Sequence, residues 1–261
     1  MADLPGKTMI ISGVGTGLGR RVALAAAREG ANLVLGARTE KTLQDVADEV
    51  DRSGQRVAIV AGDIAQDETA RRLTQTAVER FQGIDSLVNL AAYEPMGGLE
   101  QAGDFSDWRT AIEVNLIGGM QMVRAVLPPL RQSQGSIVFV SSQTQWFPPP
   151  EAPQMAYAAS KGAIWGAMHH LALEIGSSKV RVNEVAPGWM YGPPVEMYIS
   201  MTADAQGVSP DEVKQALTKD MALGDMATDA DVAEAIVFFA SPRSRGITGQ
   251  TLFVNAGEFM H

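Results

Sequence analysis

The sequence predicts a single α/β domain in which a seven-stranded parallel sheet is covered by helices on both faces, a doubly wound fold. Short segments that are almost entirely apolar alternate with helical segments, which is typical of parallel strands buried on both faces. A glycine-rich segment directly follows the first apolar run, and no linker, repeat or charge block divides the 261 residues. Seven strands are one too few for an eight-stranded α/β barrel, so we favour the doubly wound sheet.

In the first half of the chain, each expected element is an apolar or amphipathic run with a recognisable start or end. An Ala-rich helix follows the glycines and stops near Gly30, because glycine suits a helix end. Thr39 is expected to cap a second helix that continues through Ser53. The expected strands cover residues 8–12, 32–36, 57–60 and 84–90, and a third, polar helix covers residues 67–82.

The second half of the chain continues this alternation. A helix is expected from Phe105 to about Arg131, broken only near Pro128–Pro129, because proline removes a backbone donor. We interpret the segment at about 188–228, which is rich in Met, Tyr and Pro, as a lid over the substrate site. The remaining strands are expected at 136–141, 180–185 and 251–254, and the remaining helices around Tyr157 and at 229–240.

The composition of the chain excludes several classes of function. The chain has no cysteine, which excludes disulfides, thiolate metal sites and cysteine nucleophiles, and its three histidines are too few for a metal cluster. A net charge of −9 argues against nucleic acid and anionic membranes as partners. Neither a signal peptide nor a run of roughly 20 apolar residues is visible. We therefore expect a soluble, cytoplasmic protein without a bound metal.

The candidate catalytic pair lies on the helix around Tyr157. Lys161 follows Tyr157 by four residues, so the two side chains share one helix face. A free tyrosine ionises near pH ~10, which is too high for a base at neutral pH. A cation a few ångströms away favours the phenolate and lowers that pKa. The pair is a candidate proton-transfer device, although the same spacing also arises by chance on surface helices.

The glycine-rich segment is a candidate site for a dinucleotide. Gly13, Gly17 and Gly19 lie between the first strand and the first helix, where glycines let the backbone approach a pyrophosphate at the helix N-terminus. An NAD site usually has a carboxylate at the end of the second strand. Here that place holds Ala37 and Arg38, and a guanidinium suits a 2′-phosphate. The sequence therefore favours NADP(H) as the cofactor, with NAD(H) as the open alternative.

These motifs, in this order, resemble those of the short-chain dehydrogenase/reductase family in its ordinary-length branch. The segment 12–19 is similar to the family's glycine loop, and the segment 89–92 to its Asn-Asn-Ala-Gly motif. The resemblance implies a Rossmann-like domain whose catalytic residues are Asn115, Ser142, Tyr157 and Lys161. With Arg38, the expected cofactor-binding residues are Gly13, Thr16, Gly17, Leu18, Gly19, Asp63, Ile64, Asn89, Ala91, Tyr157, Lys161, Pro187, Gly188 and Met190.

The resemblance also implies how the catalytic residues act. Ser142 would hold the substrate oxygen, and Tyr157 would exchange a proton with it as the general acid/base. Lys161 would lower the pKa of Tyr157 and bond the nicotinamide ribose, while Asn115 would hold a water that links Lys161 to solvent. The nicotinamide performs the hydride transfer itself. The implied enzyme is an NAD(P)-dependent oxidoreductase that acts on a secondary alcohol or ketone.

Three departures from the family's pattern bear on function. The segment before Tyr157 is two residues longer than usual and carries Trp146, Phe147, three prolines at 148–150 and Pro153. Because proline fixes φ and stiffens the loop, we expect a rigid aromatic wall beside the substrate. Gly192 stands where the family commonly has a Thr that bonds the carboxamide, and Ala92 adds a methyl group near the cofactor.

The expected substrate site is apolar, because aromatic and methionine side chains gather in the segments assigned to it. Methionine fills irregular apolar surfaces and tolerates varied shapes. The candidate substrate-binding residues are Tyr93, Trp146, Met155, Trp189, Tyr191 and Tyr198. They favour a small apolar alcohol or ketone, cyclic or steroid-like, although packing of the lid explains them equally well.

Two other functions and the state of assembly remain open. A 3-oxoacyl-acyl-carrier-protein reductase needs a basic docking patch, for which Arg124 and Arg131 are available but residues 182–213 offer few cations. A non-catalytic dinucleotide-sensing protein would keep the fold, but the intact catalytic set disfavours it. The family usually forms dimers or tetramers, so we expect a homodimer or a homotetramer. The apolar C-terminal segment 255–261 is expected to tuck into a neighbour or into its own cleft.

Overall fold

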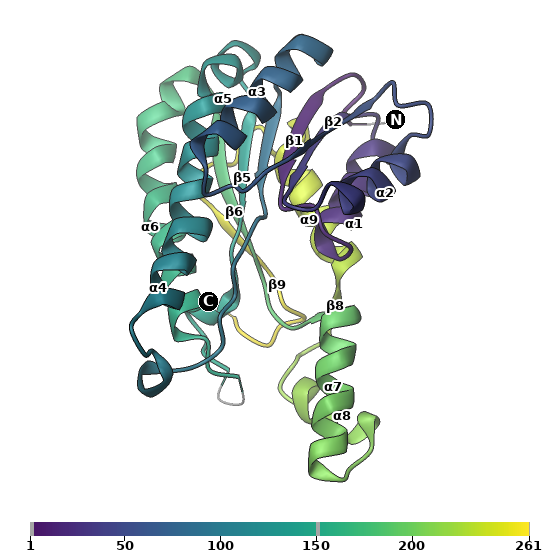
Figure 1. Cartoon of the computed structure of the whole chain (residues 1–261), viewed down its shortest axis with the longest axis vertical. Helices are drawn as coiled ribbons and strands as arrows, with labels where there is room; N and C mark the ends of the chain where they lie inside the picture. Colours follow the sequence, from purple (N-terminus) through teal and green to yellow (C-terminus); the bar gives the residue numbers. More distant parts are fainter. Residues whose placement is uncertain (1–2, 150–151, 261) are drawn as a thin grey trace.

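Seven strands pair in parallel in the computed structural model, which describes residues 3–149 and 152–260 (Figure 1). They are β1 (Thr8–Ser12), β2 (Asn32–Ala37), β3 (Val57–Ala61), β4 (Ser86–Asn89), β5 (Ser136–Val140), β6 (Arg181–Pro187) and β9 (Thr251–Val254). Their order in the sheet is β3-β2-β1-β4-β5-β6-β9. The predicted doubly wound α/β fold is therefore confirmed. Pro150, one of the three prolines expected to stiffen the loop, lies outside the described residues.

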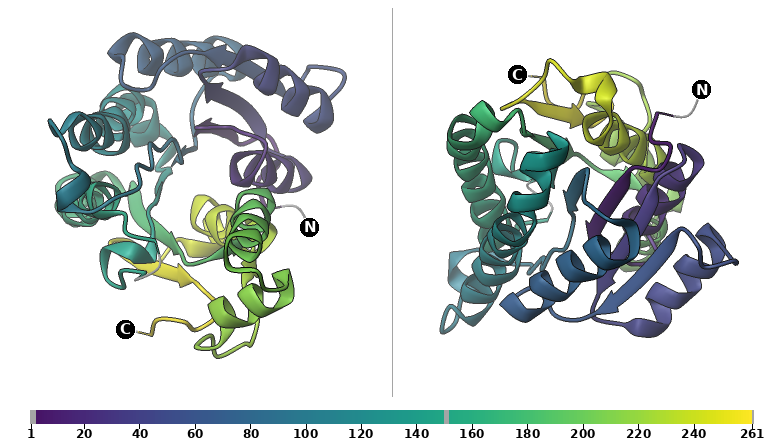
Figure 2. Two further views of the ribbon diagram at one scale, coloured as in Figure 1. Left: turned by 60° about the horizontal axis from the view of Figure 1, so that its bottom comes forward. Right: turned by 90° about the horizontal axis from the view of Figure 1, so that it is seen from above.

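Helices cover both faces of the sheet, and Figure 2 shows the two helical layers. The helices are α1 (Leu18–Arg28), α2 (Glu40–Val50), α3 (Asp67–Phe81), α4 (Ser106–Ala111), α5 (Gly119–Ser133), α6 (Met155–Ile175), α7 (Pro193–Gln206), α8 (Pro210–Thr218) and α9 (Asp229–Ala240). One face packs against α1, α2 and α9, and the other against α3, α5 and α6. Strands β1 and β5 are buried along their whole length, which explains why they are apolar on both sides. None of the described helices is both long enough and apolar enough to cross a membrane.

Short helical turns join these elements. Four are 3-10 turns: η1 (Leu99–Gln101), η3 (Gln143–Gln145), η4 (Gly176–Ser178) and η5 (Pro242–Ser244). The fifth is a π turn, η2 (Ile112–Gly118), which lies between α4 and α5. Such wide turns inside helices are frequent at functional sites.

The prediction of a helix break near Pro128–Pro129 is wrong. Helix α5 continues through both prolines to Ser133, and the irregularity lies in η2 instead. Proline leaves a gap in the helical hydrogen bonding, but one face of α5 is fully buried against the sheet, including Val126 and Leu130. This tertiary packing outweighs the local preference of the two prolines.

The second helix also ends earlier than expected. Thr39 lies at the N-cap position of α2, but its side chain makes no capping hydrogen bond. The helix ends at Val50 because Asp51 forms a turn, in which its carboxylate accepts hydrogen bonds from the backbone of Ser53 (3.1 Å) and Arg56 (2.8 Å). Asp and Ser side chains commonly compete with helical hydrogen bonds in this way.

The segment after β6 forms a small unit that extends below the sheet in Figure 1. Two short strands, β7 (Met190–Tyr191) and β8 (Ala227–Thr228), pair in parallel and bracket α7 and α8. These helices pack around their own apolar cluster, which includes Ile199, Val213 and Met221. The helical pieces expected within residues 188–228 are therefore α7 and α8.

The strand order places the candidate site at one edge of the sheet. Strands β1 and β4 are neighbours in the sheet. The chain continues from β1 to β2 on one side of this pair, and from β4 to β5 on the other side. In a doubly wound sheet, ligands bind in the crevice beyond the carboxyl ends of the strands at this reversal. The loops that follow β1, β4, β5 and β6 carry the glycine segment, Glu94, Ser142 and Met190, so the topology brings these distant segments together.

Candidate active site

Two adjacent cavities open at this edge of the sheet. The first cavity, of about 350 Å³, is lined by the start of α1, the loops after β4 and β5, α6 and the start of the lid. The second cavity, of about 380 Å³, is lined by the glycine segment and the carboxyl ends of β2 and β3. Gly17 and Leu18 line the first cavity, Gly13 and Gly15 line the second, and Ala92 lines both. The glycine segment therefore runs along both cavities.

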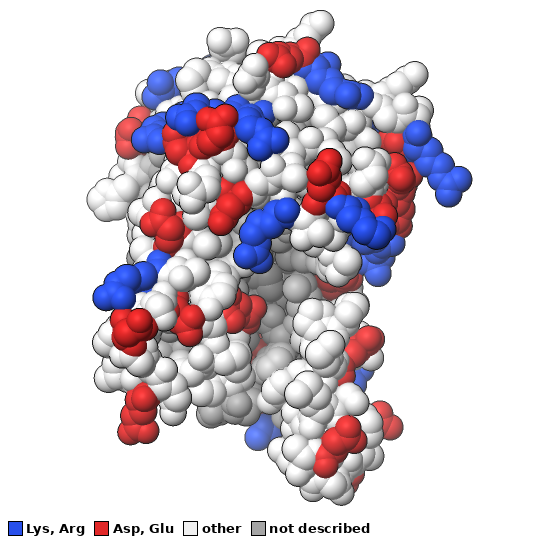
Figure 3. Space-filling view, viewed as in Figure 1, with Lys and Arg blue, Asp and Glu red and all other residues white. Residues whose placement is uncertain are grey.

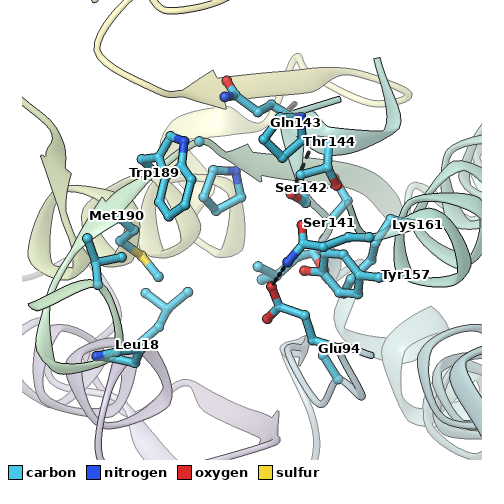
Figure 4. Close-up of a pocket in the computed structure, with 18 of the residues that line it drawn as sticks. Leu18, Glu94, Ser141, Ser142, Gln143, Thr144, Tyr157, Lys161, Trp189 and Met190 are labelled. Carbon is cyan, nitrogen blue, oxygen red and sulfur yellow. Dashed lines mark hydrogen bonds between the residues drawn. The ribbon is translucent and has the colours of Figure 1, made fainter. Parts of the chain in front are cut away.

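Helix α6 brings Tyr157 and Lys161 into the wall of the first cavity (Figure 4). Both residues are buried, with 8% and 2% of their surface exposed. The Nζ atom of Lys161 donates a hydrogen bond to the carbonyl of Val140 at the end of β5 (2.8 Å). The same atom lies 5.4 Å from the centroid of the Tyr157 ring. The predicted pair shares one helix face, and its cation is anchored to the sheet.

The electrostatics of this pair differ from the expectation that the cation lowers the pKa of the phenol. Burial raises the pKa of Tyr157 above its ordinary value, the negative charge of Glu94 acts in the same direction, and a hydrogen bond with Ser142 opposes both. Burial also lowers the pKa of Lys161 to about 8, against the charges of Glu94 and Glu184. Because the ammonium is directed to the end of β5, desolvation dominates the pKa of the phenol.

Asn115 lies in the π turn η2 and is held by three hydrogen bonds. Its Oδ1 atom accepts from the backbone N–H of Tyr93 (2.7 Å), and its Nδ2 atom donates to the Tyr93 carbonyl (2.9 Å) and to Ser160 Oγ (2.8 Å). Asn115 and Lys161 also line a small cavity of about 10 Å³. A void of about 10–15 Å³ with polar walls is the size that holds one water molecule. The geometry suits a bridging water between these two residues.

Ser142 lies two residues after the end of β5, at the N-cap of η3. Its Oγ atom accepts hydrogen bonds from the backbone N–H (3.3 Å) and the hydroxyl (3.1 Å) of Thr144. These bonds fix the hydroxyl in the wall of the first cavity, where it also interacts with Tyr157. Figure 4 shows Ser142, Tyr157 and Lys161 on the same side of the cavity. A substrate oxygen placed there would meet two hydroxyl groups.

The glycine segment fits a pyrophosphate. A Cβ atom at Gly13 would lie 2.3 Å from the backbone nitrogen of Ala91, and one at Gly19 would lie 2.7 Å from the Cα of Val14, so the fold itself requires these two glycines. At Gly15 and Gly17, a Cβ atom would meet no protein atom within 4 Å. The open space over these two glycines, at the start of α1, is therefore available to a ligand. The N–H groups of a helix N-terminus favour an anion there.

Arg38 lines the second cavity at the end of β2. Among the described residues it has no hydrogen-bond or ion-pair partner, whereas Arg20, Arg21 and Arg28 on the adjacent α1 each pair with a carboxylate. The small side chain of Ala37 leaves space beside Arg38 for a ligand, and Thr39 and Thr42 add hydroxyl groups to the same wall. This part of the cavity is suited to an anionic group.

The other predicted cofactor residues separate into three groups. Asp63, Ile64 and Ala91 line the second cavity, and Pro187, Gly188 and Met190 line the first. Thr16 is exposed and lines neither cavity. Asn89 also lies outside both walls. Its Oδ1 atom accepts a hydrogen bond from Ser12 Oγ (3.4 Å), and its Nδ2 atom donates to the Gly119 carbonyl (3.4 Å). The structure therefore places Asn89 as a link between elements that position the site.

Of the six predicted substrate-binding residues, Trp189 lines the first cavity. Tyr198 lies behind it, with ring centroids 5.3 Å apart, and supports it from outside the cavity. Tyr191 packs under the ammonium of Lys214, which lies 4.7 Å from its ring centroid. For the two tyrosines, packing within the lid is therefore what the structure shows.

The remaining three predicted substrate residues lie outside the first cavity. Trp146 packs against Trp165 of α6 and Phe253 of β9, with ring centroids 6.5 and 4.9 Å apart. Tyr93 lines the second cavity, and its hydroxyl donates to Asp107 (2.6 Å). Met155 is 46% exposed and also lies outside the wall. Of the two aromatic residues of the expected wall, Phe147 therefore lines the first cavity and Trp146 does not.

Two polar residues of the first cavity, Glu94 and Gln154, were not predicted from the sequence. Glu94 and Gln154 lie beside Tyr157, and the Gln154 amide donates a hydrogen bond to the Glu94 carboxylate (Figure 4). Glu94 lies in the loop after β4, five residues beyond the end of the strand. Because the carboxyl ends of parallel strands lie at the same edge of a sheet, the sequence did indicate that this loop lies near the site.

The C-terminal segment folds onto its own subunit, which was one of the two expected outcomes. The Nδ2 atom of Asn255 donates to Gln143 Oε1 (2.9 Å), and the Gln143 amide donates to Glu258. The ring of Phe259 stacks on Phe147, with centroids 5.8 Å apart. The end of the chain therefore supports the loop that carries Ser142.

Comparisons with known proteins agree with this geometry. A family model described as Enoyl-(Acyl carrier protein) reductase matches residues 13–258. The chain is 34% identical over 250 residues to the short-chain reductase protein NovJ of Streptomyces niveus, covering 95% of this chain and 92% of that protein. It is 35% identical over 189 residues to 11-beta-hydroxysteroid dehydrogenase A of Sesamum indicum, covering 72% of this chain but only 53% of that longer protein. The solved structure of L-sorbose reductase from Gluconobacter frateurii, in complex with NADPH and L-sorbose, matches with a TM-score of 0.92 at 25% identity and covers 100% of both chains.

The buried ammonium of Lys161 predicts a cost in stability that depends on pH. Its pKa of about 8 in the folded chain lies below the ordinary 10.5, so the charged form destabilises the fold below pH 8 and this penalty fades as the pH rises toward 10.5. We expect Lys161→Met to raise the free energy of unfolding at neutral pH by about 1–3 kcal/mol. The gain should shrink between pH 8 and 10.5.

Urea unfolding at several pH values measures this difference. Lys41→Met serves as the matched control, because Lys41 lies on the surface of α2 in an exposed ion pair with Asp45. The control should show no comparable gain at neutral pH. A loss of stability in Lys161→Met that does not change with pH would contradict the interpretation.

Proposed function

The chain belongs to the short-chain dehydrogenase/reductase family, and we propose that it transfers a hydride between a nicotinamide cofactor and a secondary alcohol or ketone. One observation carries the proposal: the hydroxyls of Ser142 and Tyr157 meet in the wall of a cavity that adjoins the open glycine segment. This arrangement provides hydrogen bonds and a proton for a substrate oxygen beside a dinucleotide site. The nicotinamide, when bound, supplies the hydride.

The chain's own residues would orient the substrate and move the proton. Ser142 holds the substrate oxygen, and Tyr157 donates a proton to it in reduction or accepts one in oxidation as the general acid/base. Lys161 replenishes that proton, since its lowered pKa of about 8 lies close to neutral pH. The small cavity between Lys161 and Asn115 would hold the water that connects the pair to solvent. The residues that would hold the cofactor are the glycine segment, Asp63, Ile64, Ala91, Pro187, Gly188 and Met190.

The cofactor we propose is NADP(H). Arg38 lines the second cavity and has no hydrogen-bond or ion-pair partner within residues 3–149 and 152–260, and a guanidinium binds a phosphate through two parallel hydrogen bonds. The cavity wall near Arg38 offers no carboxylate at the end of β2 for a ribose hydroxyl. The NADPH complex of L-sorbose reductase, a structural relative, is consistent with this choice.

The substrate we propose has an apolar body, cyclic or steroid-like. The first cavity is walled by Leu18, Phe147, Trp189, Met190 and Val195. Exposed methionines continue the apolar surface along α7, where Met197 and Met201 follow Pro193 of the cavity wall at four-residue intervals. The similarity to a hydroxysteroid dehydrogenase supports the same class. Turnover confined to small sugars would contradict it.

Two other functions are less well supported. The matching family model is described as an acyl carrier protein reductase, and acyl carriers are acidic proteins that need a basic docking surface. On the face in Figure 3, the α7–α8 unit beside the cleft is mostly uncharged or acidic. Lys161 is the one described cation in the wall of the first cavity, and it is buried. A non-catalytic sensor would not need the Ser142 and Tyr157 hydroxyls in that wall.

We also propose that the protein assembles as a homodimer or homotetramer through α6. Trp165, His169 and Leu173 lie at four-residue intervals on one face of this helix. Leu173 is 84% exposed and Trp165 43% exposed, and no Asp, Glu, Lys or Arg lies between Lys161 and Glu174. An exposed apolar stripe of this kind marks an interaction surface.

Removal of the Tyr157 hydroxyl tests the proposed function. We expect Tyr157→Phe to lower kcat by about 10²–10⁴-fold, because general acid/base catalysis contributes that much. The binding of NADPH should change by less than about threefold, since the substituted group faces the substrate. The measurement is nicotinamide absorbance with a panel of cyclic and steroidal ketones, with sugars as the polar comparison. Full activity in the variant would contradict the assignment of Tyr157.

The choice of cofactor is tested at Arg38. Loss of a charge-assisted hydrogen-bond pair costs about 1.5–3 kcal/mol, so Arg38→Ala should raise the KM for NADPH about 10–100-fold. The KM for NADH should stay within about threefold of the wild-type value. Arg131→Ala is the matched control, because Arg131 lies on α5 outside both cavities. A wild-type preference for NAD(H) would overturn the interpretation of Arg38.

The assembly surface is tested by a charge on the α6 stripe. We expect Leu173→Glu to convert the oligomer to smaller species in light scattering coupled to size exclusion, because it buries an unpaired carboxylate. Leu223→Glu is the matched control: Leu223 is 80% exposed but lies within the lid segment, between α8 and β8. A monomeric wild-type protein, or an equal effect of both substitutions, would contradict the proposal.

A further inference from the structure

One carboxylate stands apart from the other acidic groups of the first cavity. Glu94, Asp229 and Glu258 are the described acidic residues in its wall. Asp229 is bonded to Arg21 (3.2 Å), and Glu258 accepts a hydrogen bond from the Gln143 amide. Glu94 accepts one hydrogen bond, from Gln154 to its Oε1 atom, and its Oε2 atom has no partner among the described residues. This second oxygen is available to a ligand.

The carboxylate of Glu94 lies close to the reacting groups. Figure 4 shows it directed into the cavity beside Tyr157, on the side opposite Trp189. Its charge acts on both Tyr157 and Lys161, which requires that the three groups lie within electrostatic reach of one another. The surrounding protein raises the pKa of the Glu94 carboxyl, against the influence of Gln154 and Lys161. A substrate held by Ser142 and Tyr157 would therefore present a neighbouring atom to Glu94.

The Glu94 side chain is not needed to hold its loop in place. The backbone of Gly97 already bonds to the segment before α6, donating to the Pro153 carbonyl (2.7 Å) and accepting from the Met155 N–H (3.2 Å). The Glu94–Gln154 bond adds one link to this backbone pairing. Glu94 is exposed to solvent at the cavity. A substrate that fills the cavity would displace this water, which costs free energy unless the substrate offers the carboxylate a hydrogen-bond donor. A role toward the ligand accounts for its position.

We propose that Glu94 determines specificity by accepting a hydrogen bond from a donor group next to the reacting carbon of the substrate. An ionised carboxylate is an acceptor only, so the complementary group is a hydroxyl or an ammonium. The substrate then combines an apolar ring with one adjacent donor, such as a vicinal diol or amino alcohol. This inference rests on the proposed oxidoreductase function and names a finer property of the same site.

The test uses matched cyclic alcohols with NADP⁺: 1,2-cyclohexanediol, 2-aminocyclohexanol and 2-methylcyclohexanol. The wild-type enzyme should oxidise the two donor-bearing substrates with the higher kcat/KM. In Glu94→Leu, we expect kcat/KM for these substrates to fall about 10–100-fold, as the loss of a hydrogen bond to a charged group predicts. This fall is measured relative to 2-methylcyclohexanol, whose kcat/KM reports the effect of the lost charge on Tyr157 and Lys161 alone. Glu94→Gln, which keeps an acceptor but loses the charge, should affect the amino alcohol more than the diol.

Glu100→Gln is the control for a nearby acidic residue outside the cavity, and it should change no rate. Thermal unfolding of both Glu94 variants verifies that they fold. An equal fall for all three alcohols, or no fall for any of them, would overturn the inference and leave the oxidoreductase proposal intact. A wild-type enzyme that oxidises none of these alcohols and reduces none of the corresponding ketones would overturn both.

Discussion

The hydrogen bond from the buried ammonium of Lys161 to the carbonyl of Val140 (2.8 Å) joins the catalytic helix to the sheet. An ammonium in such a place is costly, because it loses most of its hydration. The charges of Glu94 and Glu184 and the Val140 carbonyl of β5 offset part of that cost. Desolvation still outweighs them, because the pKa of Lys161 is lowered to about 8. The fold tolerates this group because it is held by an extensive core on both faces of the sheet. In the proposed mechanism, this ammonium supplies the proton that Tyr157 transfers at neutral pH.

The positions of the other catalytic groups follow from that anchor. With α6 fixed against β5, Tyr157 lines the first cavity, and Ser142, two residues after β5, lies beside it. The π turn η2 brings Asn115 against Ser160 of α6, so the same helix also positions the proposed water site. Three segments far apart in sequence thus meet at one edge of the sheet. The chemistry is built on regular elements, while the lid and the loops after β4 and β5 shape the space around it.

The sequence predicted those parts of the molecule that depend on local pattern. The strands, the order of the motifs and the presence of Tyr157 and Lys161 on one helix face were all visible in it. Side-chain directions after a loop were not, since Trp146 and Phe147 are adjacent and only the tertiary turn η3 decides which one enters the cavity. The continuous α5 helix through Pro128–Pro129 depends on burial against the sheet, which no local preference encodes. The effect of burial on the pKa of Tyr157 was missed for the same reason.

Transfer of a labelled hydride is the most direct test of the account. NADPH that carries deuterium at C4 of the nicotinamide would be incubated with the wild-type enzyme and a cyclic ketone, and the product analysed by mass spectrometry. The account predicts one deuterium on the carbinol carbon for each cofactor oxidised when the label is on one face of the nicotinamide ring, and none when it is on the other. Cofactor that binds at the two cavities but transfers no label to any ketone, with NADPH or with NADH, would contradict it.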